Sequence, residues 1–349
     1  MGAETAVLST DTLNNVVLGV FVVFAIVGAW AGFAKGFVRS AVKVASIVLA
    51  IVVAFFAMPL VVPKVYQLAL PYLDDALSSF AELFVASPTL KEYFPTLVMG
   101  LTSPLLFVVV FALCLLVVAI VRAITNGLLK SALAQKSSSL GRIGGLVCGA
   151  VAGVLVALCF VFPVTGYLTA VPTIYTNVRE FVYTDDNPIH PQVEEVIINL
   201  PNISAVKTVN QLTAKQFDKF VAYQDGEKKF STLDDLTTLT SLISPAMRFK
   251  NSVGSISTLD DQSLRDISAI LQTNDKLRVL ATEIANYASK KWLNNEPFVG
   301  YNLKEKFDPE YKLVLDLMLT DLANCTPDTI VEVLNKIADT LQVVREVFG

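Results

Sequence analysis

The sequence predicts an all-α protein: a four-helix transmembrane bundle followed by an extramembrane all-helical domain. The chain of 349 residues is 54% hydrophobic and 17% charged, whereas soluble proteins average about 45–50% and about 25%. Its apolar residues concentrate in four long runs within residues 1–170, while residues 171–349 show helical periodicity. Residues 1–170 contain 9 Lys or Arg and 6 Asp or Glu, whereas residues 171–349 contain 18 Lys or Arg and 25 Asp or Glu. The chain is therefore neither wholly soluble nor purely transmembrane.

The four apolar runs are the expected membrane spans. An apolar helix of about 18 or more residues crosses the roughly 30 Å hydrocarbon layer. Pro104 and Pro163 are expected at span ends, where a missing amide hydrogen bond costs least. The first run is expected to be retained rather than cleaved as a signal peptide, because the residues before it include Glu4 and Asp11 but no Lys or Arg. The spans are expected at about residues 13–33, 40–62, 104–121 and 143–164.

Basic residues near the spans set the expected orientation. Lys and Arg collect on the cytoplasmic side of a membrane, and the loops after the first and third spans are basic and contain no acid. We therefore expect a multi-pass protein of a bacterial plasma membrane. Its N-terminus, segment 64–100 and residues 171–349 are expected to be extracytoplasmic. The basic residues are expected to direct insertion without binding a ligand; they are Lys35, Arg39, Lys43, Arg122, Lys130, Lys136 and Arg142.

The outward segment 64–100 is expected to contain a short amphipathic helix. Apolar residues from Leu73 to Phe84 recur at helical spacing, and the acids between them fall mostly on other faces. Pro88 and Pro95 are expected to break the chain before the third span. Two roles stay open for this helix. The sequence favours packing against the end of the bundle over lying on the outer membrane interface.

Glycine at four-residue spacing is the most specific pattern in the spans. Every fourth residue falls near one face of a helix, and glycine there lets a second backbone approach closely. Both series belong to the cytoplasmic halves of their spans. Spans one and four are therefore expected either to pack on each other or to present grooves to another copy of the chain. The series are Gly28, Gly32 and Gly36 in span one, and Gly141, Gly145, Gly149 and Gly153 in span four.

Residues 171–349 are expected to form a compact domain of five to seven helices. Asn274 is a candidate N-cap for a helix that ends near Trp292. Thr326, followed by proline and an acid, is a candidate N-cap for the C-terminal helix. Further helices are expected at 204–223 and 309–322.

No catalytic, metal or cofactor site is predicted. His190 is the lone histidine, and three of the four cysteines lie in apolar runs, so a His/Cys metal centre is not expected. Adjacent acids such as Asp234 and Asp235 point apart on a helix. Ser40 and Lys43 have serine–lysine spacing without the companion motifs of an acylating enzyme. Because strongly basic tracts are missing, no nucleic acid partner is expected.

Two motifs resemble the colicin V production protein (CvpA) family. The first, at residues 32–39, reads Gly-Phe-Ala-Lys-Gly-Phe-Val-Arg, and the second enters span four at residues 140–155. The likeness covers about residues 12–170, and the four-span layout agrees with it. It implies an inner-membrane protein linked to colicin V production or export, and it supplies no catalytic residues. Gly141 and Ala152 stand where the family often carries an acid and an arginine, so a role of those charges is not expected here.

The leading interpretation is a non-catalytic membrane scaffold that supports toxin production, export or envelope assembly through contacts with an envelope or export protein. Two alternatives stay open. One is an oligomeric, channel-like or transport-associated protein that uses its glycine faces between copies. No span contains Asp or Glu, although ion-coupling sites usually have one. The other is a membrane-tethered extracytoplasmic enzyme, which would need a cleft with converging titratable residues in the second half.

Overall fold

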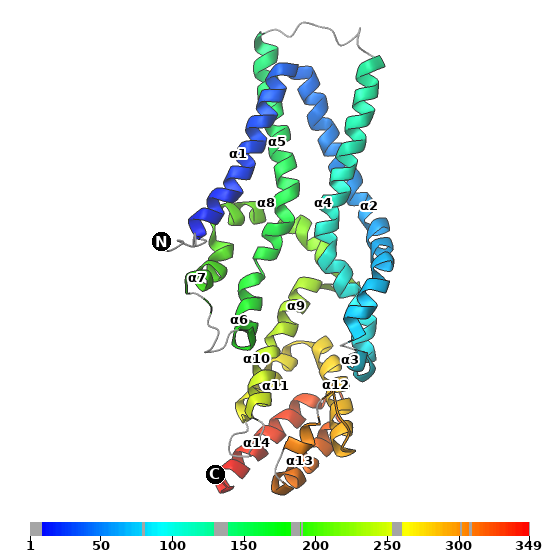
Figure 1. Ribbon diagram of the computed structural model, residues 1–349, viewed down its shortest axis with the longest axis vertical. Helices are drawn as coiled ribbons and strands as arrows, with labels where there is room; N and C mark the ends of the chain where they lie inside the picture. Colours follow the sequence, from blue (N-terminus) through cyan, green and yellow to red (C-terminus); the bar gives the residue numbers. More distant parts are fainter. Residues whose placement is uncertain are drawn as a thin grey trace, which may run out of the picture. The chain divides into compact units, whose positions relative to one another are not determined.

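The computed structural model is almost entirely helical in the residues that it describes (Figure 1). The all-α fold class is therefore confirmed. The described residues are 9–78, 81–128, 139–182, 189, 191–252, 260–300, 302–306 and 309–348.

Each of the four apolar runs lies in one long helix. All four helices are long and apolar enough to cross a membrane, which confirms the predicted spans. Each helix extends beyond the run that predicted it. The helices are α1 (Thr10–Lys35), α2 (Phe37–Leu77), α4 (Pro88–Leu128) and α5 (Ser139–Leu168).

Proline does not mark the ends of these spans. Pro104 lies inside α4 and Pro163 lies inside α5, and both are fully buried. The expectation that they end the spans is therefore wrong. A proline removes one backbone donor and strains a helix, but in membrane helices the packing of neighbouring helices accommodates the break.

Segment 64–100 is divided among three helices. The α2 helix continues to Leu77, the short α3 helix spans Ala81–Ala86, and α4 begins at Pro88 and continues through Pro95. The expected single amphipathic helix is therefore wrong, and so is the break at Pro95, whereas the expected break at Pro88 is confirmed because α3 ends at Ala86 and α4 begins at Pro88. Pro88 occupies the first turn of α4, where a missing N–H has little effect.

The described chain forms two compact units that interleave along the sequence instead of meeting at one boundary near residue 170. Helices α2 and α4 each contribute to both units. Unit 1 comprises residues 1–67, 99–172 and 189–233, and unit 2 comprises residues 68–98, 173–188 and 234–349.

Unit 1 combines the spans with short elements from the polar half of the sequence. These elements are α7 (Pro191–Asn199), η2 (Leu200–Asn202), α8 (Ser204–Val221), β1 (Ala222–Asp225) and β2 (Lys228–Ser231). The α8 helix lies across the spans rather than along them (Figure 1) and contacts α1 and α5. The Ala205 N–H donates to Asn14 Oδ1 of α1 at 3.0 Å, which caps the start of α8.

Phenylalanines fill the interior of unit 1. Phe107 of α4 is fully buried and meets Phe162 of α5 edge-on, with ring centroids 5.4 Å apart. Phe220 of α8 stacks on Phe55 of α2 at 4.9 Å. Four helices therefore share one aromatic core, and this core joins the amphipathic α8 helix to the spans.

The β-hairpin was not predicted from the sequence. We expected a helix to residue 223, but α8 ends at Val221, and Ala222 pairs with Ser231. Gly226 in the turn has a φ of +60°, a conformation that favours glycine. Asp225 followed by glycine is the turn signal that would have predicted the hairpin.

Unit 2 is a set of helices around an aliphatic core. This core includes Leu271, Ile330 and Leu341, which are almost completely buried. The five to seven helices expected after residue 170 are too few, because the described residues there hold nine α-helices, several of only 9 to 12 residues. Besides α3, the elements are most of α6 (Val171–Val182), α9 (Thr232–Ser241), α10 (Ile243–Ser252), α11 (Asp261–Thr273), α12 (Asp275–Leu293), η4 (Leu303–Lys306), α13 (Pro309–Leu322) and α14 (Ile330–Phe348).

The predicted N-caps have different outcomes. The Leu277 N–H donates to Asn274 Oδ1 at 3.0 Å, so Asn274 caps α12 as predicted. Thr326 does not start the C-terminal helix directly. Its carbonyl accepts a hydrogen bond from the Thr329 N–H at 3.0 Å in a turn, and α14 begins at Ile330.

Glu283 of α12 holds the first turn of α4 within unit 2. Its carboxylate accepts hydrogen bonds from the Thr89 hydroxyl at 2.7 Å, from the Thr89 N–H at 3.2 Å and from the Ser87 hydroxyl. These donors lie at a helix N-terminus, where backbone N–H groups have no partner inside the helix and a negative charge is favourable. The carboxylate therefore replaces the missing backbone acceptors.

Replacing this carboxylate should destabilise unit 2. Glu283→Ala leaves three partly buried donors without their acceptor, which should lower the free energy of unfolding by about 1–3 kcal/mol. Unfolding in detergent, followed by the fluorescence of Trp292 in the same unit, measures the change. Glu346→Ala removes an exposed carboxylate bonded to Gln342 and should change stability by less than about 0.5 kcal/mol. Equal effects of the two substitutions would contradict the assigned role of Glu283.

Candidate functional site

The structure brings the two glycine series together within one chain. Helices α1 and α5 lie side by side (Figure 1). A methyl group added at Gly149 would lie 2.9 Å from Gly32 Cα, and one added at Gly145 would lie 2.7 Å from the Gly36 carbonyl carbon. Side-chain carbons do not approach a backbone so closely. Only glycine therefore allows the two helices to pack at this distance.

The contacts follow an antiparallel register. Each step of four residues forward along α1 is matched by a step of four residues back along α5. The facing pairs are Gly28 with Gly149, Gly32 with Gly145, and the Phe24 carbonyl with Gly153. Gly141, the remaining member of the series, lies in the first turn of α5. A bulky residue at any facing position would separate both helices.

Gly36 also forms the turn between α1 and α2. It is the single residue between the two helices, and its φ of +76° favours glycine. Its N–H donates to the Gly32 carbonyl at 2.9 Å, and the buried Ser40 hydroxyl donates to the same carbonyl at 3.3 Å. The Ser40 hydroxyl thus supports the turn. Phe37, the next residue in the motif, packs against Gly144, where an added methyl group would lie 2.9 Å from the ring.

A basic side chain joins α4 to this turn. The Arg122 guanidinium donates to the Arg39 carbonyl at 2.6 Å. The contacts of Ser40, Phe37 and Arg122 were not predicted. Phe37 belongs to the motif at residues 32–39, Ser40 follows it directly, and Arg122 of α4 contacts its last residue, Arg39.

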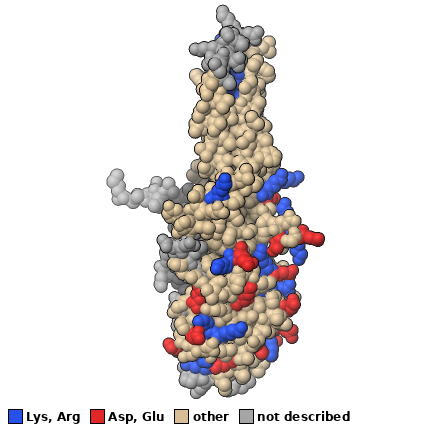
Figure 2. Space-filling model, turned by 90° about the vertical axis from the view of Figure 1, so that its right-hand side faces the viewer, with Lys and Arg blue, Asp and Glu red and all other residues tan. Residues whose placement is uncertain are grey.

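This end of unit 1 carries cations without neighbouring acids in the sequence. Residues 12–73 and 93–179 contain no Asp or Glu. Arg142 lies exposed in the first turn of α5, while Lys130 and Lys136 lie outside the described residues. On the face drawn in Figure 2, the side chains over the spans are almost all uncharged, whereas acids and bases mix over the helices of unit 2.

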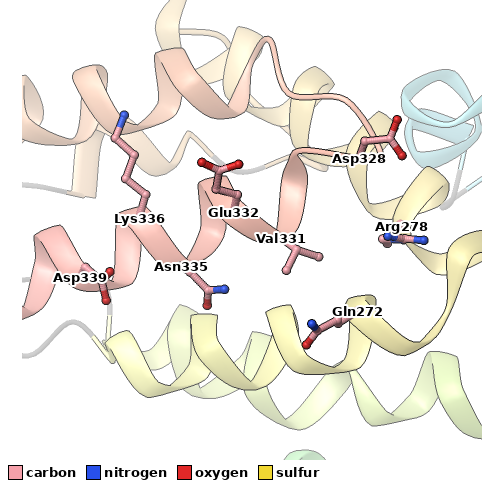
Figure 3. Close-up of a pocket in the computed structure, with 8 residues that line it drawn as sticks. All are labelled: Gln272, Arg278, Asp328, Val331, Glu332, Asn335, Lys336 and Asp339. Atoms are coloured by element: carbon pink, nitrogen blue, oxygen red, sulfur yellow. The ribbon is translucent and has the colours of Figure 1, made fainter.

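A tethered enzyme would need a cleft with converging titratable residues. Unit 2 contains a groove of about 560 Å³. Residues of α11, α12 and α14 line it, and their side chains point in different directions (Figure 3). Glu332 and Lys336 extend away from Gln272, on the opposite side of α14 from Asn335. The groove therefore does not bring its titratable groups together.

Several charges of the groove already have partners. The Lys336 ammonium pairs with Asp321 at 2.7 Å, and this contact holds the pKa of Lys336 above its usual value. Asp339 pairs with Arg265 at 2.8 Å, and Arg278 pairs with Asp275. His190 lies outside the described residues. The described residues hold no group of three or more His, Cys, Asp or Glu that could bind a metal ion.

The spans carry the chain's likeness to known proteins. Residues 16–180 match the family Colicin V production protein. The match includes most of α1, all of the other spans, and the motif that forms the Gly36 turn. It confirms the resemblance to this family and ends before α7. Among curated proteins and among solved structures, none matches the chain.

Within the region that matches this family, the departure at residue 152 has a packing reason. Ala152 of α5 is fully buried in the same core as Phe107 and Phe162. An arginine at this position would have to displace part of that core. The small residue is therefore consistent with the closed packing around Gly149 and Gly153.

A matched pair of glycine substitutions should test the packing of α1 on α5. Gly149→Leu places a side chain into the Gly28 and Gly32 backbone, and overpacking of this kind should cost about 1–3 kcal/mol or more. Gly19→Leu is the control, because Gly19 lies in α1 with no atom within 4 Å of an added methyl group. The thermal stability of the purified chain in detergent should fall for the first variant only. Equal stability of the two variants would contradict the assigned contact.

Proposed function

We propose that this protein is a non-catalytic scaffold in a bacterial plasma membrane that supports toxin production, export or envelope assembly. The Colicin V production domain anchors it, and unit 2 supplies the surface for an envelope or export protein. The observation that carries the proposal is the closed packing of the spans. Two helices meet backbone to backbone, and phenylalanines fill the space between the others. This packing favours a fixed anchor.

The same packing argues against the channel-like alternative. That alternative needs glycine faces that remain free for other copies of the chain. In the structure these faces contact each other within one chain. The interior of unit 1 contains Phe107 and Phe111, both completely buried, and aromatic rings offer no ligands to replace the hydration shell of an ion.

Flux measurements separate the scaffold from a channel. The full chain reconstituted into liposomes should leave the permeability to K⁺ and to a small anionic dye equal to that of protein-free liposomes, because the aromatic core blocks the bundle. Gramicidin serves as the positive control for K⁺. A protein-dependent increase in either flux would contradict the scaffold proposal.

We further propose that unit 2 is extracytoplasmic. The basic residues at the Gly36 turn, at Arg122 and at Arg142 support this orientation, since such residues concentrate on the cytoplasmic side. The spans cross the membrane four times, so the N-terminus and the C-terminal region share one side.

Cysteine labelling should report this orientation. Lys290 is exposed on α12, and Lys290→Cys should react with a membrane-impermeant maleimide in intact spheroplasts, whereas Lys136→Cys should react only after permeabilisation. The unmodified chain is the control. Cys325 is buried, and burial raises the pKa of its thiol, which keeps it protonated and unreactive. The reverse labelling pattern would overturn the orientation while leaving the four spans intact.

A further inference from the structure

A cavity of about 360 Å³ lies in unit 1 between α2, α4 and α8. Its walls include Phe55, Pro59 and Pro63 of α2, Ser103 of α4 and Phe220 of α8. Cavities that bind small molecules measure about 300–1,000 Å³ and are mostly apolar. The volume and lining therefore suit an apolar chain.

The cavity lies at the end of the spans opposite to the basic end. Val62 of α2 and Ser103 of α4 line it, and each is 19 residues from a cation, Lys43 and Arg122 respectively. At 1.5 Å per residue this separation is about 29 Å along the helix. It matches the roughly 30 Å hydrocarbon thickness. The cavity therefore lies where the second leaflet meets its headgroups.

Two prolines remove backbone donors beside the cavity. Pro59 and Pro63 both lie within α2 and both line the cavity. Neither has an N–H, so the carbonyls of Phe55 and Pro59, four residues earlier, cannot accept the usual α-helical hydrogen bond. In the apolar part of a membrane such a carbonyl needs another donor. A hydroxyl-bearing headgroup at this depth would supply one.

Lysines of α8 add positive charge at the same place. Lys219 lines the cavity, and Lys215 lies one turn earlier on the same exposed face of α8. In the described part of the chain neither lysine has a carboxylate within ion-pair distance. Asp218 projects about 100° away from Lys219 around the helix, but it is three residues after Lys215 and lies beside that lysine, so the anion contact is assigned to Lys219. The opening of the cavity is thus complementary to an anion.

We infer that this cavity binds an anionic phospholipid, with an acyl chain against Phe55, Pro63 and Phe220 and with the phosphate at Lys219. A glycerol hydroxyl of the headgroup can donate to the Pro59 carbonyl, for which Pro63 supplies no N–H. The lipid would join α2, α4 and α8 at the outer interface. This site depends on the membrane position of the spans and not on the scaffold role, so a protein-dependent flux, which would overturn the scaffold proposal, leaves it unaffected.

Native mass spectrometry of the full chain in detergent tests the phosphate contact. The probes are palmitoyl-oleoyl phosphatidylglycerol and the zwitterionic phosphatidylcholine with the same chains. Lys219→Ala should weaken phosphatidylglycerol binding about fivefold, the effect of one lysine near a membrane surface. Lys207→Ala is the control, because Lys207 is exposed on α8 but does not line the cavity. Equal binding of phosphatidylglycerol by the two variants would overturn the contact with Lys219.

A second pair of variants tests the cavity itself. Pro63→Trp fills the opening and restores the missing N–H, so it should weaken binding of both lipids at least about fivefold. Pro71→Trp makes the same change at another exposed proline of α2 that does not line the cavity, and it should leave binding unchanged. Equal lipid binding by these two variants would overturn the proposed cavity. Loss of binding in Pro63→Trp alone supports it.

Discussion

Direct contact between the backbones of α1 and α5 is the constraint on which unit 1 depends. Lipid tails are as apolar as the helix surfaces, so burial of apolar area does not drive helices together within a membrane, and close packing must do so. The glycines at 28, 32, 145, 149 and 153 leave no side chain between the two backbones at these positions. Once the two helices are joined, the Gly36 turn fixes the start of α2, and the Arg122 hydrogen bond fixes the end of α4.

The region that matches the Colicin V production family does not pack as a unit by itself in this chain. Its core includes Phe217 and Phe220 of α8, which lies after the region that matches the family. Gly166 of α5 leaves the space that the Phe217 ring occupies. The extra C-terminal segment therefore does more than add a second unit. It completes the packing of the spans by supplying an amphipathic helix whose apolar face is aromatic.

The sequence was most informative where one physical rule decided the outcome. Four apolar runs specified four spanning helices, and the four-residue spacing of glycine indicated the faces that meet. The sequence was least informative at proline, because one proline, Pro88, begins α4 while another, Pro104, lies inside the same helix. Only the surrounding packing distinguishes the two cases.

The division into units could not be predicted from hydropathy. Composition changes near residue 170, but α8 and the hairpin pack with the spans, while the ends of α2 and α4 pack with the C-terminal helices. The aromatic residues Phe217 and Phe220 could have indicated that α8 packs with the spans. For the candidate site, the motif at residues 32–39 indicated where to look. The hydrogen bonds of Ser40 and Arg122 depend on three-dimensional proximity that no spacing rule supplies.

The single-residue turn at Gly36 has a mechanical consequence. Only one residue separates α1 from α2, so the start of α2 cannot shift along α1. Glycine contacts fix α1 to α5, so these two helices cannot slide past each other. Bilayers differ in thickness by several ångströms, and a membrane protein adapts by tilting, by kinking or by deforming the lipid. Here α1 and α5 must tilt as one rigid body and carry the start of α2 with them, so a thinner bilayer would change the inclination of this pair and not the register within it.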